Sequence, residues 1–201
     1  MNDLHETYVS GEIARLLSPV AGSTAEKCEQ ILLNRYLKPE AVFSANYEEL
    51  KMLVGQRAAE HIYLLARITS RRLSSRFAFG KKHTQCELVD YLKALFLGLS
   101  SEHLYLISFG PDWEVISADL VGVGTVNSAA VSPRTVVDFA IKRGAKSIML
   151  AHNHPGGKAE PSAEDNEMLS TMGFVLEKAG IRLAGHIIIA GNCHYVASIG
   201  T

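Results

Sequence analysis

The segment SIMLAHNHPGG, residues 147–157, decides how we expect this chain to fold. It opens with a short apolar run, Ser147–Ala151, which is typical of a buried β-strand. His152 and His154 follow at once, and side chains two positions apart on a strand project to the same side. Pro155 and two glycines then allow the chain to turn. The sequence therefore predicts a buried strand that ends in two imidazoles directed at one point.

A helix start follows this turn, in the segment PSAED, residues 161–165. Ser162 and Asp165 have the spacing of a capping box, so both side chains could serve only to begin a helix. The first turn of that helix could also bring the Asp165 carboxylate to the two histidines. Two imidazole nitrogens and one carboxylate oxygen are three protein ligands, which leave the fourth position of a tetrahedral zinc ion for water or substrate. The alternatives are a catalytic type of zinc site, or a helix cap beside exposed loop histidines.

Helix and strand signals alternate from Thr84 onward. Glu87 stands three residues after Thr84 and precedes a row of leucines, a pattern that predicts a capped helix. A second helix is expected between Pro133 and Gly144. Strands are expected at residues 104–107, 115–121, 147–151, 181–190 and 195–199. These elements predict an α/β fold around one mixed sheet.

The chain before residue 77 has a different pattern. Its apolar residues recur at spacings of three and four, which is typical of short amphipathic helices. We expect these helices to be separated at Pro19, Gly22, Pro39 and Gly55. Basic residues are then dense between Arg67 and Lys82, where a helix end is expected to run into a linker. The sequence thus predicts a helical domain at residues 1–82 and an α/β domain at residues 83–201.

The net charge of −1 over 201 residues combines two unequal parts. Residues 1–82 hold 12 Lys and Arg against 9 Asp and Glu, whereas residues 83–201 hold 8 against 12. This composition, with 47% hydrophobic residues, excludes a disordered acidic chain and a uniformly basic nucleic-acid coat protein. We expect the two parts to have different functions.

Cysteine usage and hydropathy bear on the location of the protein. Its three cysteines, Cys28, Cys86 and Cys193, fit neither a disulfide framework nor a CxxC metal site. The first residues do not resemble a secretory signal, and no apolar run reaches 18 residues. These features predict a cytoplasmic protein without a membrane span, and nothing in them sets an oligomeric state.

The motif around the histidines resembles that of a known family. The run His152-Asn153-His154-Pro155, with Ser162 and Asp165 downstream, resembles the JAMM signature of MPN-domain metalloproteases. In the form His-Asn-His-Pro with Pro-Ser-x-x-Asp it is most similar to the bacterial RadC-like proteins. Further similar segments are GTVNS at 124–128, VSPR at 131–134 and HIII at 186–189. The resemblance covers residues 84–201.

This resemblance implies a JAMM/MPN domain of cytidine-deaminase-like fold that holds one Zn²⁺ through His152, His154 and Asp165. It implies a metallopeptidase that hydrolyses a peptide or isopeptide bond in a peptide or protein substrate. In that mechanism Glu102 is the general acid/base and Ser162 donates a hydrogen bond to the developing oxyanion. The residues themselves do not distinguish such a substrate from another amide.

Several assignments stay open at this point. Glu114 and Asp119, near or on the next predicted strand, are the alternatives to Glu102, which could also be a solvated loop residue. His186 is either a residue that orients a metal ligand or a hydrogen-bonded core residue. The chain also departs from the RadC-like pattern, because Ser132, Thr135 and Gly185 replace a histidine, a glutamate and an aspartate that are common there.

The helical part resembles a helix-hairpin-helix module, in which a Gly-x-Gly turn brings backbone amides to a DNA phosphate. The corresponding stretch here is LKMLVGQRAA, residues 50–59, in which one glycine of the pair is missing. Ala58 and Ala59 could simply begin the next helix. DNA contacts are possible through Arg57, Arg67, Arg71 and Arg72, although basic helix faces are commonly just solvated. The alternative function is therefore a DNA-repair-associated DNA-binding protein whose JAMM domain is a metal-bound scaffold, and a helical protein-interaction module competes with DNA binding.

Overall fold

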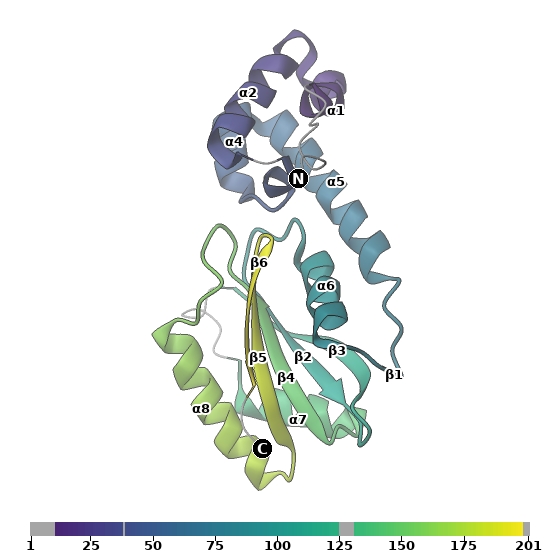
Figure 1. Cartoon of the computed structure of the whole chain (residues 1–201). Helices are drawn as coiled ribbons and strands as arrows, with labels where there is room; N and C mark the ends of the chain where they lie inside the picture. The colour runs from purple at the N-terminus through teal and green to yellow at the C-terminus, as the bar shows by residue number, and fades with distance from the viewer. Residues whose placement is uncertain (1–10, 38, 125–130, 199–201) are drawn as a thin grey trace, which may run out of the picture.

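The computed structural model describes residues 11–37, 39–124 and 131–198. It is a mixed α/β structure, with a group of helices followed by a six-stranded sheet and three further helices (Figure 1). The first group comprises α1 Glu12–Ala21, a 3₁₀ turn at Gly22–Thr24, α2 Ala25–Tyr36, α3 Pro39–Phe43, α4 Tyr47–Val54 and α5 Gln56–Ser74. Their apolar faces meet in one core around Leu17, Leu32, Leu50 and Ile62.

Pro19 was expected to end a helix, and this prediction was wrong: Pro19 lies inside α1. A proline lacks the N–H that would bond to the carbonyl of Arg15, four residues earlier. The Ser18 hydroxyl donates to that carbonyl at 3.0 Å and replaces the missing bond. The helix therefore continues to Ala21 and stops at Gly22, whose φ of 53° is left-handed.

Helices α4 and α5 are joined by a single residue, Gly55, whose φ of 81° favours glycine. Asn46 caps α4, because its side-chain oxygen accepts from the backbone amides of Glu48 and Glu49. Ala58 and Ala59 lie in the first turn of α5 and are buried in the helical core. They are therefore part of a packed helix.

The sheet has the strand order β1-β3-β2-β4-β5-β6, in which β4 and β5 are parallel and the other neighbours antiparallel. Its strands are β1 Lys81–Lys82, β2 His103–Phe109, β3 Glu114–Val123, β4 Ser147–Asn153, β5 Arg182–Ala190 and β6 Cys193–Ser198. The predicted mixed sheet is thus confirmed. The division between residues 82 and 83 stays a prediction, and Lys81 and Lys82 already pair with β3.

Helices cover both faces of the sheet. On one face, α6 (Gln85–Phe96) packs against alternate residues such as Ile107, Ala151 and Ile187. On the other, α7 (Pro133–Arg143) and α8 (Ala163–Lys178) pack against Leu106, Ile148 and Leu150. The period of two along β4 therefore directs Met149 and Ala151 to α6, and Ile148 and Leu150 to α7 and α8.

The predicted helix ends follow local side-chain chemistry. Thr84 and Glu87 form the expected capping box of α6, since Glu87 accepts from the Thr84 amide at 2.8 Å. Pro133 begins α7, and Gly144 ends it with a φ of 66°. In the part of the chain that the structure describes, no helix combines the length and apolar character needed to cross a membrane.

Arg67 ties the helical part to the sheet part. Its guanidinium donates to the carbonyl of Leu97 at 3.0 Å and to that of Leu95 at 3.5 Å, just at the end of α6. The hydroxyl of Ser70 donates to the Leu95 carbonyl at 3.3 Å. Helices α5 and α6 lie side by side (Figure 1). Arg67, one of the arginines considered for phosphate contacts, is therefore engaged between them.

We expect Arg67→Ala to lower the free energy of unfolding by about 1–2 kcal/mol, because partly buried carbonyls lose a charged donor. Urea denaturation measures this change. Arg71→Ala is the matched control on the exposed side of α5 and should change stability by less than about 0.5 kcal/mol. Equal effects of both substitutions would contradict a structural role for Arg67.

Candidate functional site

His152 and His154 lie at the carboxyl end of β4, at the end of the sheet near the helical part. His152 follows Ile148 and Leu150 on the face that α8 covers, and 3% of its surface is exposed. The backbone amide of His154 donates to the Ile189 carbonyl at 2.8 Å, which extends the contact with β5 by one residue. A turn follows, in which the Gly157 amide donates to the His154 carbonyl.

The first turn of α8 brings Asp165 to the two histidines. Ser162 caps this helix: its hydroxyl accepts from the Asp165 amide at 3.0 Å, and the Asp165 carboxylate accepts from the Ser162 amide at 2.8 Å. The capping box expected from the sequence is thus confirmed. Because the cap fixes Asp165 in the third position of the helix, its carboxylate, 1% exposed, points at the end of β4.

Ligand-type atoms of three side chains meet at this point. His152 Nε2 lies 2.8 Å from His154 Nε2 and 3.2 Å from Asp165 Oδ1, and His154 Nε2 lies 3.5 Å from Asp165 Oδ2. Among the described residues, these three form the group of His, Cys, Asp and Glu side chains that could hold a metal ion. The structure therefore brings together all three ligands expected from the sequence.

Both imidazoles are held in place by their second nitrogen. His152 Nδ1 lies 2.9 Å from Nε2 of the fully buried His186, and His154 Nδ1 lies 2.8 Å from the Lys158 carbonyl. A carbonyl can only accept, so the proton of neutral His154 sits on Nδ1 and leaves a lone pair on Nε2. If His152 likewise donates from Nδ1 to His186, two Nε2 lone pairs face one another.

Lone pairs that face each other at 2.8 Å repel unless a proton or a cation lies between them. Ligand atoms of a tetrahedral zinc ion, each at about 2.0–2.1 Å from the metal, are about 3.3 Å apart. The two imidazole nitrogens are 2.8 Å apart, each faces a different Asp165 oxygen at 3.2 or 3.5 Å, and one ligand-type atom from each residue lies within 4.8 Å of the other two. In addition, Asp165 Oδ1 is buried without a hydrogen-bond partner among the described residues. The donor set and its spacing therefore fit a zinc ion.

The electrostatics of the group agree with this arrangement. In the metal-free protein, where protons can lie on the Nε2 atoms, burial alone would raise the pKa of Asp165, but the hydrogen bonds that His152 and His154 then donate outweigh it and hold the pKa far below its usual range. The hydrogen bond to Asp165 raises the pKa of His154, and burial opposes this effect. Burial, followed by the nearby His152, lowers the pKa of His186 to about 3. Asp165 is thus a carboxylate and His186 a neutral imidazole at neutral pH.

Glu102 precedes β2 directly and is half-buried, and its charge contributes to the raised pKa of His154. The two alternatives lie elsewhere. Glu114 accepts from the Asp112 amide in the hairpin between β2 and β3, at the far end of β2. Asp119 forms an ion pair with Arg143 of α7. Of the three carboxylates, Glu102 is therefore the one near the histidines.

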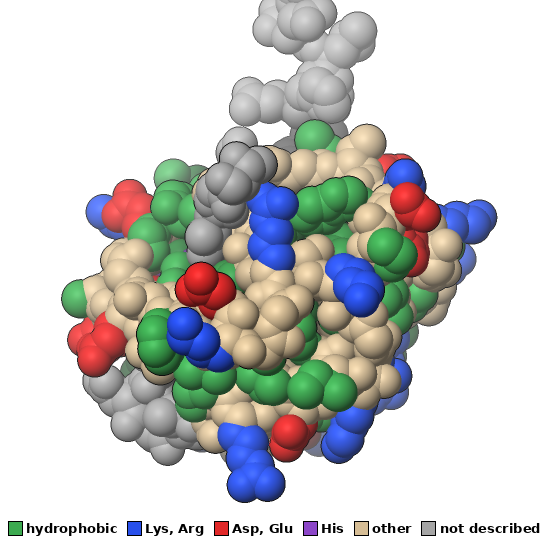
Figure 2. Space-filling model, turned by 90° about the horizontal axis from the view of Figure 1, so that it is seen from below, with side chains coloured by type: hydrophobic (Ala, Val, Ile, Leu, Met, Phe, Trp, Pro, Cys, Tyr) green, Lys and Arg blue, Asp and Glu red, His purple; other side chains and the backbone are tan. Residues whose placement is uncertain are grey.

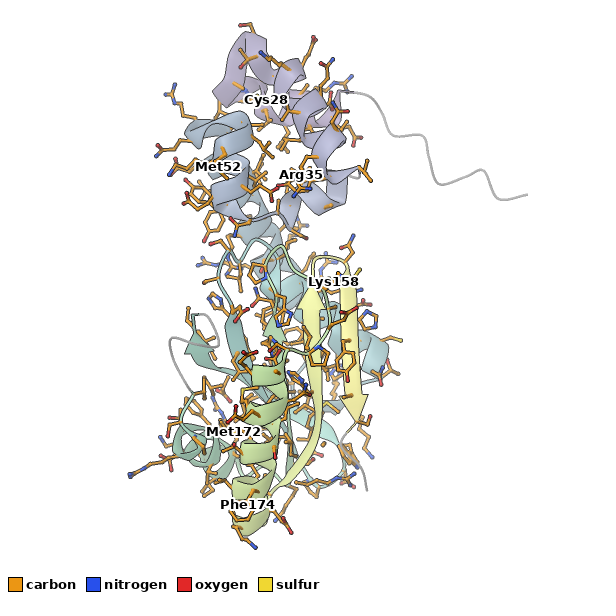
Figure 3. All side chains as sticks on the ribbon, turned by 90° about the vertical axis from the view of Figure 1, so that its left-hand side faces the viewer. Cys28, Arg35, Met52, Lys158, Met172 and Phe174 are labelled. Atoms are coloured by element: carbon orange, nitrogen blue, oxygen red, sulfur yellow. The ribbon has the colours of Figure 1, made fainter. Side chains whose placement is uncertain are left out.

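The Ser162 hydroxyl forms a hydrogen bond to the carboxylate of Asp165. Its oxygen lies 2.7 Å from Asp165 Oδ2, and because an ionised carboxylate only accepts, Ser162 donates to it. Two contacts at the site were not foreseen from the sequence. The Lys158 carbonyl, in the loop between β4 and α8 (Figure 3), gave no side-chain signal. Asn153, between the two histidines, bonds to residues on either side of Glu102.

Comparisons with known proteins point to one family. The model of the RadC-like JAB domain matches residues 83–199. A UPF0758 protein of Rubrobacter xylanophilus is 34% identical over 151 residues, which cover 74% of this chain and 66% of that protein, just under two thirds. UPF0758 proteins of Janthinobacterium sp. and Clostridium kluyveri are 30% and 32% identical. Those two alignments cover 88% and 92% of this chain, and 80% and 84% of the relatives.

We expect His186→Ala to lower zinc affinity about 10- to 100-fold, because His152 loses the partner that orients its ring. A competition titration with a chromophoric chelator measures the affinity. His194→Ala, on the exposed part of β6, is the control and should bind zinc as the unmodified protein does. Unchanged zinc affinity in His186→Ala would show that His186 is a core residue and does not orient His152.

Proposed function

Because this chain belongs to the RadC-like JAB family, we propose that it is a zinc-dependent metallopeptidase that hydrolyses a peptide or isopeptide bond. One observation carries the proposal: one ligand-type atom each of His152, His154 and Asp165 lies within 4.8 Å of the other two, and Nδ1 of both imidazoles has its own partner. Helices on both faces of a mixed sheet support the JAMM/MPN, cytidine-deaminase-like fold that the motif implies.

The three ligands leave a fourth tetrahedral position, which is typical of catalytic zinc sites. Zinc supplies Lewis acidity at such a site and lowers the pKa of water towards about 7. A small cavity on the α6 side of His154 is lined among others by Ser44, Lys93 and Pro155.

Glu102 is the proposed general acid/base. Its carboxylate takes the proton from the attacking water as the new C–O bond forms, and gives a proton to the amine as the C–N bond breaks. Its position near His154 supports this role. The net reaction consumes one water and releases a carboxylic acid and an amine.

Ser162 is proposed to assist the reaction at the carbonyl oxygen. Its hydroxyl donates to Asp165 Oδ2, so it orients this ligand while the site is at rest. Donation to a developing oxyanion requires the hydroxyl to turn away from Asp165. If the hydroxyl hydrogen turns and Oγ stays in place, Oγ still accepts from the Asp165 amide and the Ser162 amide still donates to the Asp165 carboxylate, so the cap is retained.

Glu102→Gln tests the enzyme proposal. The variant should bind zinc as tightly as the unmodified protein, since Glu102 is not among the ligands, and should cleave peptides about 10²- to 10⁴-fold more slowly. Mass spectrometry of new amino termini in a peptide library measures cleavage. His152→Ala should lose both zinc and cleavage. Zinc-loaded unmodified protein that cleaves no peptide would contradict the proposal.

DNA binding by the helical part is a second candidate function, and one observation supports it. Arg57, Arg71 and Arg72 are exposed on α5, whereas Arg67 is engaged with α6. The opposite end of the molecule, seen in Figure 2, presents basic, acidic and apolar side chains mixed together. In this second proposal, DNA phosphates bind to the face of α5 that carries the exposed arginines. The JAMM domain then acts as a metal-bound scaffold.

Salt dependence separates this candidate from nonspecific association. Duplex affinity, measured by fluorescence anisotropy, should fall with salt, and each arginine lost should reduce the logarithmic slope by about 0.9. The triple variant Arg57→Ala, Arg71→Ala, Arg72→Ala should therefore bind weakly and with a smaller slope. Lys142→Ala with Lys178→Ala is the control on exposed helix ends of α7 and α8. A duplex affinity that does not change with salt concentration would show that the binding does not depend on phosphate contacts.

A further inference from the structure

The pairing of β2 with β4 stops at His152, the first of the proposed metal ligands. Its last backbone pair is Leu104 with His152, so regular pairing would next join His103 to Asn153. The amide of His103 instead donates to the side-chain oxygen of Asn153 at 2.8 Å. The side-chain nitrogen of Asn153 donates to the carbonyl of Ser101 at 3.0 Å. An asparagine side chain thus replaces a peptide group where the two strands part.

These two bonds enclose Glu102, which lies between Ser101 and His103. A third bond holds Glu102 itself, whose carbonyl accepts from the Gly124 amide at 2.9 Å. The Ser101 carbonyl also lies 2.9 Å from Nδ1 of His103. The backbone that carries the Glu102 side chain is therefore fixed from β4 on one side and from the end of β3 on the other.

Asn153 stands between two metal ligands but belongs to the other face of the sheet. The alternation along β4 directs His152 to α8, and Asn153 follows Ala151 on the face of α6. Only 4% of Asn153 is exposed. Its amide is therefore committed to the segment around Glu102 and lies away from the three ligand atoms.

We propose that Asn153 is a positioning residue that sets Glu102 at the correct place relative to His152 and His154. This inference rests on the proposed function of Glu102. The metal ligands and Asn153 are consecutive on one rigid strand, so the same strand places the metal and, through Asn153, the acid/base. An amide suits this task because its nitrogen donates and its oxygen accepts, and both atoms form a bond here.

Two substitutions at Asn153 test its two hydrogen bonds in different ways. Asn153→Ala removes both bonds and leaves the His103 amide without its acceptor. Asn153→Asp keeps the size and the acceptor, but sets a carboxylate oxygen against the Ser101 carbonyl, where the donor had been. The control Asn34→Asp makes the same chemical change on the exposed surface of α2.

The first measurement does not depend on activity. In metal-free protein, amide hydrogen exchange followed by NMR should become about two- to tenfold faster at His103 in Asn153→Ala, whereas amides in the middle of β2 should not change. Zinc affinity should stay within about threefold of the unmodified protein in both variants, a smaller change than the 10- to 100-fold loss typical of residues that orient ligands. Unchanged exchange at His103, or loss of zinc, would overturn the proposal.

The second measurement is peptide cleavage by the zinc-loaded protein. A misplaced acid/base should lower kcat by about 10²-fold and change KM little, because a small displacement from reactive geometry has an effect of that order. Asn153→Ala combined with Glu102→Gln should be no slower than Glu102→Gln alone, since Asn153 acts through Glu102. Effects that multiply in the double variant would contradict a role through Glu102.

Failure of this proposal and failure of the enzyme proposal give different results. If the unmodified protein binds zinc but cleaves nothing, the metallopeptidase proposal falls, and the His103 exchange rates alone decide whether Asn153 holds the segment. If the unmodified protein cleaves peptides and Asn153→Ala cleaves them equally well, the enzyme proposal stands and the positioning role is wrong.

Discussion

The close approach of two imidazoles at the end of β4 is the constraint on which the account of this protein depends. Nitrogen lone pairs 2.8 Å apart, beside a buried carboxylate, need a positive charge among them. A proton satisfies this need in the metal-free protein, and the raised pKa of His154 is the expected sign of it. A zinc ion satisfies it better, because it bonds to all three residues at once.

The fold supplies the rigidity that such crowding requires. β4 is a central strand between β2 and β5, and its residues are packed by α6 on one face and by α7 and α8 on the other. His186 comes from the parallel neighbour β5, and Asp165 from the helix that connects β4 to β5. One strand–helix–strand unit therefore contributes the three candidate ligands and the imidazole that lies against His152.

Elements encoded by neighbouring residues could be predicted from the sequence. The capping boxes at Thr84 and Ser162 depend on contacts three residues apart, and the alternation of β4 depends on a period of two. These local rules also predicted that His152, His154 and Asp165 come together. Pro19 was misjudged because its effect on α1 is offset by the Ser18 hydroxyl, a compensation that residue type alone does not reveal.

Contacts between distant segments could not be predicted in this way. Asn153 bonds to residues 50 and 52 positions earlier, and Arg67 bonds to carbonyls about 30 positions later. Both partners are backbone groups, which carry no signature in the sequence. The Lys158 carbonyl is also a backbone group without a signature in the sequence, although it lies only four residues after His154, and its position depends on the turn between them.

The most direct test of the central claim is X-ray diffraction at the zinc absorption edge, on crystals of protein purified without chelator and supplied with zinc. The account predicts one anomalous peak at about 2.0–2.2 Å from His152 Nε2, His154 Nε2 and a carboxylate oxygen of Asp165. A folded protein with no peak between these residues, or with zinc held by other side chains, would contradict it.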